Sequence, residues 1–129
     1  MTSMGLGTVT AVLLVWSVLV LIPMAPGGLV DTRSFASLPR WQFNAFNVFL
    51  TSLGLASLVT AWFALSGGRT AFAAAIVLGL LYIAVFGLDL AAVFPKVADP
   101  LPVQLLVLEV LDLAAAGALV VVAVQALRL

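Results

Sequence analysis

Four long apolar runs constrain this chain more than any other feature of its sequence. Residues 1–30, 41–68, 70–88 and 113–127 contain no charged side chain, and apolar sequence continues past the acids that bound the last two runs. A helix of about 20 apolar residues crosses a hydrocarbon layer about 30 Å thick. The chain therefore has enough apolar sequence for four membrane-spanning helices.

The composition argues against an ordinary water-soluble domain. Of the 129 residues, 65% are hydrophobic and only 8% are charged, whereas a soluble domain carries about 25% charged residues. Five basic and five acidic side chains are too few to cover a surface that faces water. Because the net charge is zero, electrostatics does not favour nucleic acid as a partner. The partner that the composition predicts is the lipid bilayer.

Proline and glycine residues divide the apolar sequence into four predicted spans, at residues 5–24, 43–65, 71–94 and 102–126. Prolines and glycines at 23–28, Ser-Gly-Gly at 66–68 and prolines at 95–102 fall at or between the span ends. Proline cannot continue the helical hydrogen bonds, and glycine frees the backbone. We therefore expect an all-α integral membrane protein, an antiparallel four-transmembrane-helix bundle that forms a single transmembrane domain over residues 1–129. We expect the first span to be retained, because no basic residue precedes it.

The positive charges predict an orientation. Antiparallel spans place the two termini and the 66–70 turn on one side of the membrane, and the 30–42 and 94–101 loops on the other. The basic side chains divide between these sides, Arg69 and Arg128 with the termini, and Arg33, Arg40 and Lys96 with the loops. Cytoplasmic loops carry an excess of positive charge, so we expect the loops to be cytoplasmic and the termini outside.

Three acidic residues lie within the predicted spans, all towards the loops. Asp89 is on the third span, and Glu109 and Asp112 share one face of the fourth. At a rise of about 1.5 Å per residue, Asp89 and Glu109 reach nearly the same depth. A charged acid at the bilayer centre costs about 3 kcal/mol. We therefore expect the three acids to face the bundle interior, a water-filled recess or another subunit.

Other polar side chains are predicted to gather near these acids. Asn44, Asn47 and Thr51 follow a helical spacing at the start of the second span, which enters from the same side. Tyr82 precedes Asp89 by seven residues and so lies on about the same helix face. The predicted site thus has a polar lining and a rim of basic charge. The lining is Asn44, Asn47, Thr51 and Tyr82, and the rim is Arg33, Arg40 and Lys96.

The sequence offers little for enzymatic chemistry. It contains no Cys and no His, which removes disulfides, thiol nucleophiles, and histidine-ligated haem or zinc. We expect no catalytic residue, no cofactor and no metal site, and therefore no enzymatic activity. The enzymatic alternative is a paired-carboxylate mechanism on a lipid-soluble substrate, with Asp89 and Glu109 as acid and base.

Two functional interpretations lead. The first is a non-enzymatic accessory or assembly subunit, which associates through helix packing and its carboxyl groups. Small residues at Ala75, Gly79 and positions 114–118 favour such packing. The alternative is proton- or cation-coupled transport, or ion conduction, by a homo-oligomer that uses Asp89, Glu109 and Asp112. The expected partner is a second copy of the chain or a larger membrane complex, and binding of a lipid or pigment between the spans is a further alternative.

Overall fold

The computed structural model describes residues 3–25, 30–95, 97 and 99–129, and this part of the chain contains helices and no strands. The helices are α1 (Ser3–Met24), α2 (Arg40–Leu65), α3 (Arg69–Leu90) and α4 (Val103–Arg128). The predicted all-α architecture with four helices is confirmed. Each helix is long and apolar enough to cross a membrane, which indicates a multi-pass membrane protein.

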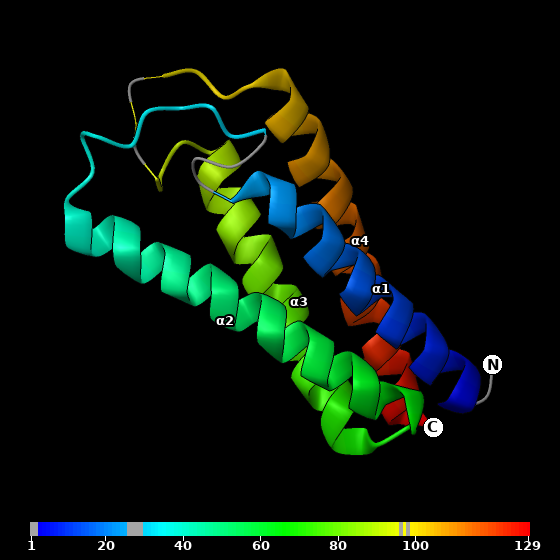
Figure 1. Cartoon of the computed structure of the whole chain (residues 1–129). Coiled ribbons are helices and arrows are strands. Elements are labelled where there is room, and N and C mark those ends of the chain that lie inside the picture. Colours follow the sequence, from blue (N-terminus) through cyan, green and yellow to red (C-terminus); the bar gives the residue numbers. More distant parts are fainter. Residues whose placement is uncertain (1–2, 26–29, 96, 98) are drawn as a thin grey trace.

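The helices run antiparallel and pack in a ring (Figure 1). Both α1 and α3 contact α2 and α4, whereas α1 and α3 contact each other only slightly across the bundle. Both termini and the short α2–α3 turn lie at one end of the bundle, hereafter the terminal end. The described parts of the connections 25–39 and 91–102 lie at the opposite end, hereafter the loop end.

Small residues bring α3 and α4 into close contact. Ala75 is fully buried, and Gly79 lies one turn further along the same face. A Cβ atom added at Gly79 would lie 2.7 Å from a methyl carbon of Val120 and 3.2 Å from the carbonyl oxygen of Ala116. Tight backbone approach at small residues is a main source of helix association in membranes. It holds α3 against α4, the two helices that carry the intramembrane acids.

The outer surface of the bundle is apolar along the length of its helices. Leu19 is 60% exposed, Trp62 71% and Val110 52%. A soluble protein rarely leaves such continuous apolar surface in water, whereas hydrocarbon chains solvate it. Exposed apolar side chains on all four helices therefore surround the polar side chains inside the bundle.

α3 ends at Leu90, four residues before the predicted end of the third span. Ala92 adopts a left-handed backbone conformation with φ of 58°. The Ala92 N–H donates to the carbonyl of Asp89 at 3.0 Å, and the Val93 N–H donates to that of Leu88 at 2.9 Å, the pattern of a Schellman termination. The sequence stays apolar through this turn, so composition alone does not reveal where the helix ends. The other boundaries differ from prediction by up to three residues.

α2 and α3 each end in a residue with a left-handed backbone conformation, and we expect substitutions at these two residues to change stability in opposite directions. Gly67, with φ of 74°, ends α2 without steric cost, whereas a non-glycine residue such as Ala92 in this conformation loses about 1 kcal/mol. We expect Ala92→Gly to raise the midpoint of thermal unfolding in detergent, and Gly67→Ala to lower it. Shifts of the same sign in the two variants would contradict this explanation of the helix ends.

Candidate functional site

The Arg33 side chain is the centre of a buried ion-pair network at the loop end. Its Nε and Nη2 atoms donate to the two carboxylate oxygens of Asp31 at 2.8 and 2.9 Å. Its Nη1 and Nη2 atoms donate to the two oxygens of Asp89 at 2.9 and 3.3 Å. Both pairs have the two-pronged geometry that a guanidinium makes with a carboxylate. One side chain thereby connects the α1–α2 connection to the end of α3.

Local contacts of the α1–α2 connection position Arg33. Its backbone N–H donates to Asp31 at 3.3 Å, and its guanidinium lies 5.4 Å from the centre of the Phe35 ring, a favourable cation–π distance. The Ser34 N–H donates to Asp99 at 2.6 Å, which links this connection to the one between α3 and α4. The hydrogen bonds that Arg33 donates to Asp31 are the largest cause of a rise in the pKa of Arg33 above its ordinary value. Burial opposes this rise, and the hydrogen bonds that Arg33 donates to Asp89 add to it. Arg33 therefore remains a cation at every physiological pH.

Glu109 of α4 completes the network, which we call the charged cluster: Asp31, Arg33, Asp89 and Glu109. The Glu109 carboxyl group lies against that of Asp89 and is 2% exposed. Its Oε2 atom has no hydrogen-bond partner in the described part of the chain. All four side chains line a cavity of about 20 Å³, hereafter the inner cavity, which has room for about one water molecule.

Asp112 lies one helical turn deeper on α4 and is fully buried. Ser17 of α1 lies beside its carboxyl group, but the Ser17 hydroxyl donates to the carbonyl oxygen of Leu13 at 2.9 Å. Neither Asp112 oxygen has a hydrogen-bond partner among the residues that the structure describes. An unpartnered buried polar group costs about 1–3 kcal/mol, and more when it is charged. Such groups are few in native structures, and each needs a physical explanation.

Tyr82 of α3 also faces Asp112, but its hydroxyl group is occupied by α2. The Tyr82 and Ser57 hydroxyl oxygens are 2.7 Å apart, and Ser57 is 2.7 Å from the carbonyl oxygen of Leu53. Ser57 has one proton, which it donates to Leu53. Tyr82 therefore donates to Ser57. This hydrogen bond between α3 and α2 lies at the deep end of the row of polar side chains that starts at Arg33.

A second space connects the charged cluster with the loop-end surface. This outer pocket, of about 490 Å³, lies between the end of α3 and the 91–102 connection. Its lining is Arg33, Asp89, Leu90, Ala92, Pro95, Val97, Asp99, Pro100 and Leu101. Arg33, Asp89 and Pro95 belong to both linings. These three residues lie between the outer pocket and the inner cavity.

The interior at this end is acidic. Asp31, Asp89, Glu109 and Asp112 are all buried, with Arg33 as the single basic side chain among them. Uncompensated charge is strongly disfavoured away from water, so the remaining carboxyl groups require protons or cations. Among the described residues no group of three or more acidic side chains is arranged to hold a metal ion.

The structure does not bring the predicted polar residues of α2 to the acids. Asn44 is exposed, Asn47 donates to the Phe43 carbonyl at 3.0 Å, and Thr51 donates to the Asn47 carbonyl at 2.9 Å. The physical reason is that α2 lines the inner cavity through the apolar side chains of Phe46 and Leu50, while its first turn lies apart from the other helices (Figure 1). The prediction that Asn44, Asn47 and Thr51 line the site is wrong. Tyr82 does lie inside, but pairs with Ser57.

The predicted rim also differs from the structure. Arg33 is only 8% exposed and lies within the site rather than at its edge, because two carboxylates neutralise it there. Arg40 is exposed, and Lys96 lies outside the described residues. Sequence reasoning missed Asp31. One signal was available: Asp31 and Arg33 lie two residues apart, directly after an uncharged run. At this spacing the two side chains can pair with each other and so enter the bundle together.

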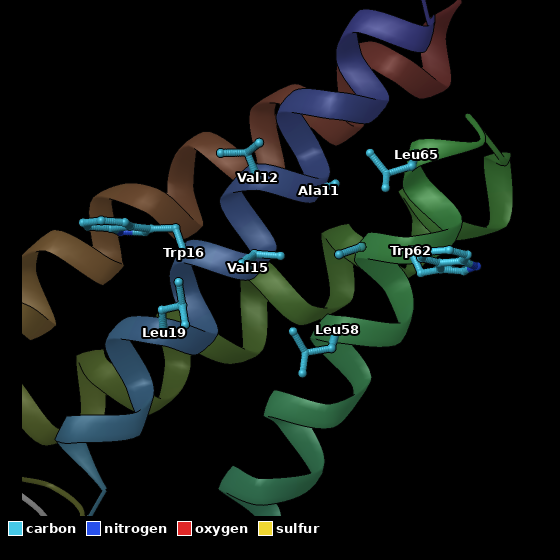
Figure 2. A pocket seen from close by; sticks show the side chains of 9 residues that line it. Ala11, Val12, Val15, Trp16, Leu19, Leu58, Trp62 and Leu65 are labelled. Atoms are coloured by element: carbon cyan, nitrogen blue, oxygen red, sulfur yellow. The ribbon is translucent and has the colours of Figure 1, made fainter.

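An apolar groove lies between α1 and α2, away from the charged cluster (Figure 2). Its volume is about 490 Å³, and its small lining residues Ala11 and Ala61 are buried. Trp16 of α1 and Trp62 of α2 flank it on opposite sides, 45% and 71% exposed. The groove carries no charged side chain and offers shape and apolar contact only.

The ion pairs of Arg33 predict unequal effects of removing two aspartate charges. Asp31→Asn leaves a buried guanidinium with half of its carboxylate partners, and we expect the free energy of unfolding to fall by about 3 kcal/mol. Asp99→Asn, at an exposed position, is expected to cost less than about 1 kcal/mol. Denaturant unfolding in detergent micelles measures both. Equal losses would show that Arg33 does not depend on Asp31.

Comparison with curated proteins and with solved structures finds no significant match to this chain. A family model described as "Domain of unknown function (DUF8051)" matches residues 6–129. The match includes every residue of the charged cluster, Asp112 and Tyr82, and parts of all four helices. The chain therefore belongs to the DUF8051 family.

Proposed function

We propose that this chain is a non-enzymatic membrane protein that takes up protons or monovalent cations into its interior from the loop end. The observation that carries the proposal is Asp112, a fully buried carboxyl group without a hydrogen-bond partner in the described residues. It lies one turn beyond the charged cluster. Ionisable groups inside membranes are rare and commonly mark ion or proton pathways.

The proposed route follows the polar side chains inward. A proton or cation enters the outer pocket, where Asp99 and Asp89 supply negative charge. It passes the Arg33–Asp89 pair to Glu109 at the inner cavity. Asp112, about 4.5 Å further along α4, is the next acceptor. At Glu109 and at Asp112, the incoming proton or cation binds a carboxyl oxygen that has no hydrogen-bond partner among the described residues.

Beyond Asp112 the bundle is sealed by apolar side chains. Leu14, Phe72 and Leu119 are each 0–1% exposed and fill the core towards the terminal end. Release on that side therefore requires a helix to move, and we propose that this helix is α2. Apolar grooves flank α2 where it faces α1 and where it faces α3, so its packing is incomplete on both sides. The Tyr82–Ser57 hydrogen bond would break as α2 moves.

We further propose that the loop end faces the cytoplasm and that the protein works as a homo-oligomer. The excess of Arg and Lys in the loop-end connections supports the orientation. Small residues that border open space on α3 and α4, Gly87 and Gly117, support association with further copies. The acids face inward within one chain, so a second copy would stabilise the bundle without completing the site.

An accessory or assembly role in a larger membrane complex is the second candidate. The observation that favours it is the groove between α1 and α2, where Trp16 and Trp62 flank a floor of small residues (Figure 2). A partner helix that filled this groove would bury both rings. Co-purification of a defined complex that Trp62→Ala abolishes, together with absence of flux, would favour this role over transport.

The uptake proposal predicts loss of flux when the two deep acids are neutralised. In proteoliposomes with an enclosed pH indicator, and with K⁺ and valinomycin to drive uptake, we expect Glu109→Gln with Asp112→Asn to reduce flux to that of protein-free vesicles. Both substitutions keep the side-chain shape and remove the charge. Gln125→Ala, at an exposed position on α4, should retain full flux. Unmodified protein without flux for protons or alkali cations would end the proposal.

The orientation can be tested because the chain contains no cysteine. Ser37→Cys lies in the α1–α2 connection and Ser66→Cys lies in the α2–α3 turn, both at exposed positions. We expect an impermeant maleimide added to intact cells to label the Cys at position 66 and not that at position 37. The reverse pattern would show that the loop end faces outward.

A further inference from the structure

Arg33 occupies the boundary between the two polar spaces of the site. Its side chain lines both the outer pocket and the inner cavity, together with Asp89 and Pro95. The side chain is only 6% exposed. Of the three residues shared by the two spaces, Arg33 and Asp89 are the charged ones, so a direct path from the outer pocket to Glu109 runs beside this pair.

The guanidinium is held firmly in that position. Four side-chain hydrogen bonds of 2.8–3.3 Å fix it between Asp31 and Asp89, and the Phe35 ring lies against it. A guanidinium has donors only and is always charged. It therefore offers no oxygen ligand to an incoming metal cation and repels it. A fixed arginine of this kind is a known device for excluding cations from a narrow passage.

The inner cavity is also poorly suited to a metal cation. Its volume of about 20 Å³ admits about one water molecule. The oxygens of Asp31 and Asp89 that line it are engaged by Arg33, and Glu109 Oε2 is the lining oxygen without a partner in the described chain. An alkali cation needs several oxygens to replace its hydration shell. A proton needs one carboxyl oxygen, and a single bridging water can deliver it.

We propose that Arg33 is a selectivity residue, which admits protons to Glu109 and Asp112 and excludes Na⁺ and K⁺. This inference rests on the uptake function proposed above and narrows its substrate to the proton. The ionisable groups that face Arg33 are Asp31 of its own connection, Asp89 of α3 and Glu109 of α4, with Asp99 across the outer pocket. Asp112 and Tyr82 lie deeper, and α2 contributes the Ser57 hydroxyl.

Competition by alkali cations in proteoliposomes tests the proposal. Proton flux is measured in choline, Na⁺ or K⁺ buffers of equal ionic strength, at a membrane potential clamped to the same value in each. For the unmodified protein we expect the same flux in all three. For Arg33→Gln we expect Na⁺ and K⁺ to compete with protons, because removing a unit positive charge at the boundary strengthens cation binding on the order of 100-fold. Arg33→Lys keeps the charge and should remain insensitive to alkali cations.

Matched variants separate this effect from misfolding. Arg40→Gln removes an exposed arginine at the same end and should leave the flux insensitive to Na⁺. If Arg33→Gln does not fold, Arg33→Gln with Asp31→Asn removes one cation and one anion together. It should show weaker competition of the same kind, because the net charge is unchanged but Asp89 loses its guanidinium partner. Saturable inhibition of the unmodified protein by Na⁺ or K⁺ overturns the selectivity proposal, as does a folded Arg33→Gln protein that stays insensitive. Absence of any flux from the unmodified protein is a different result, because it overturns the uptake function itself.

Discussion

The pairing of one guanidinium with two carboxylates, away from water, is the interaction on which the loop end of this bundle depends. Arg33 joins Asp31 in its own connection to Asp89 at the end of α3. In a medium of low polarity each of these charges is tolerated only because the others are present. Their positions then determine where the outer pocket ends and where the inner cavity begins. Glu109 takes its place in this arrangement because α4 packs tightly on α3.

The helices contribute unequally to this arrangement. α3 and α4, in close contact at Gly79, carry Asp89, Glu109 and Asp112, and α1 adds Ser17 beside Asp112. α2 supplies the hydroxyl groups of Ser57, Thr51 and Thr60 and otherwise presents apolar side chains to its neighbours. The bundle thus consists of a well-packed group of three helices around the acids and a fourth helix flanked by grooves. Such a division suits a protein in which one element moves while the others hold the site.

Buried acids are costly, and this chain places Asp112 where nothing in the described structure donates a hydrogen bond to it. A purely structural bundle gains nothing from such a group, because an apolar side chain of similar size would pack there without the cost of desolvation. Association with a partner would be served better by polar groups on the outer surface, which is apolar. These two arguments support our proposal that protons or cations enter the interior of the bundle.

The sequence by itself determined the number of helices, their antiparallel order and the exclusion of the acids from lipid, but not whether the acids face the bundle interior, a water-filled recess or another subunit. Each of these follows from the cost of placing charge or unsatisfied backbone in hydrocarbon, which acts on residue type and spacing alone. The early end of α3 escaped prediction, because the backbone turns at Ala92 within a stretch that remains apolar. The partners of the acids also depended on tertiary structure. Asn44, Asn47 and Thr51 were at a suitable depth, but α2 places Phe46 and Leu50 at the inner cavity instead. The connection after α1 places Asp31 and Arg33 inside. Which side of a helix turns inward and which path a loop takes depend on packing between segments distant in sequence, and no local pattern encodes them.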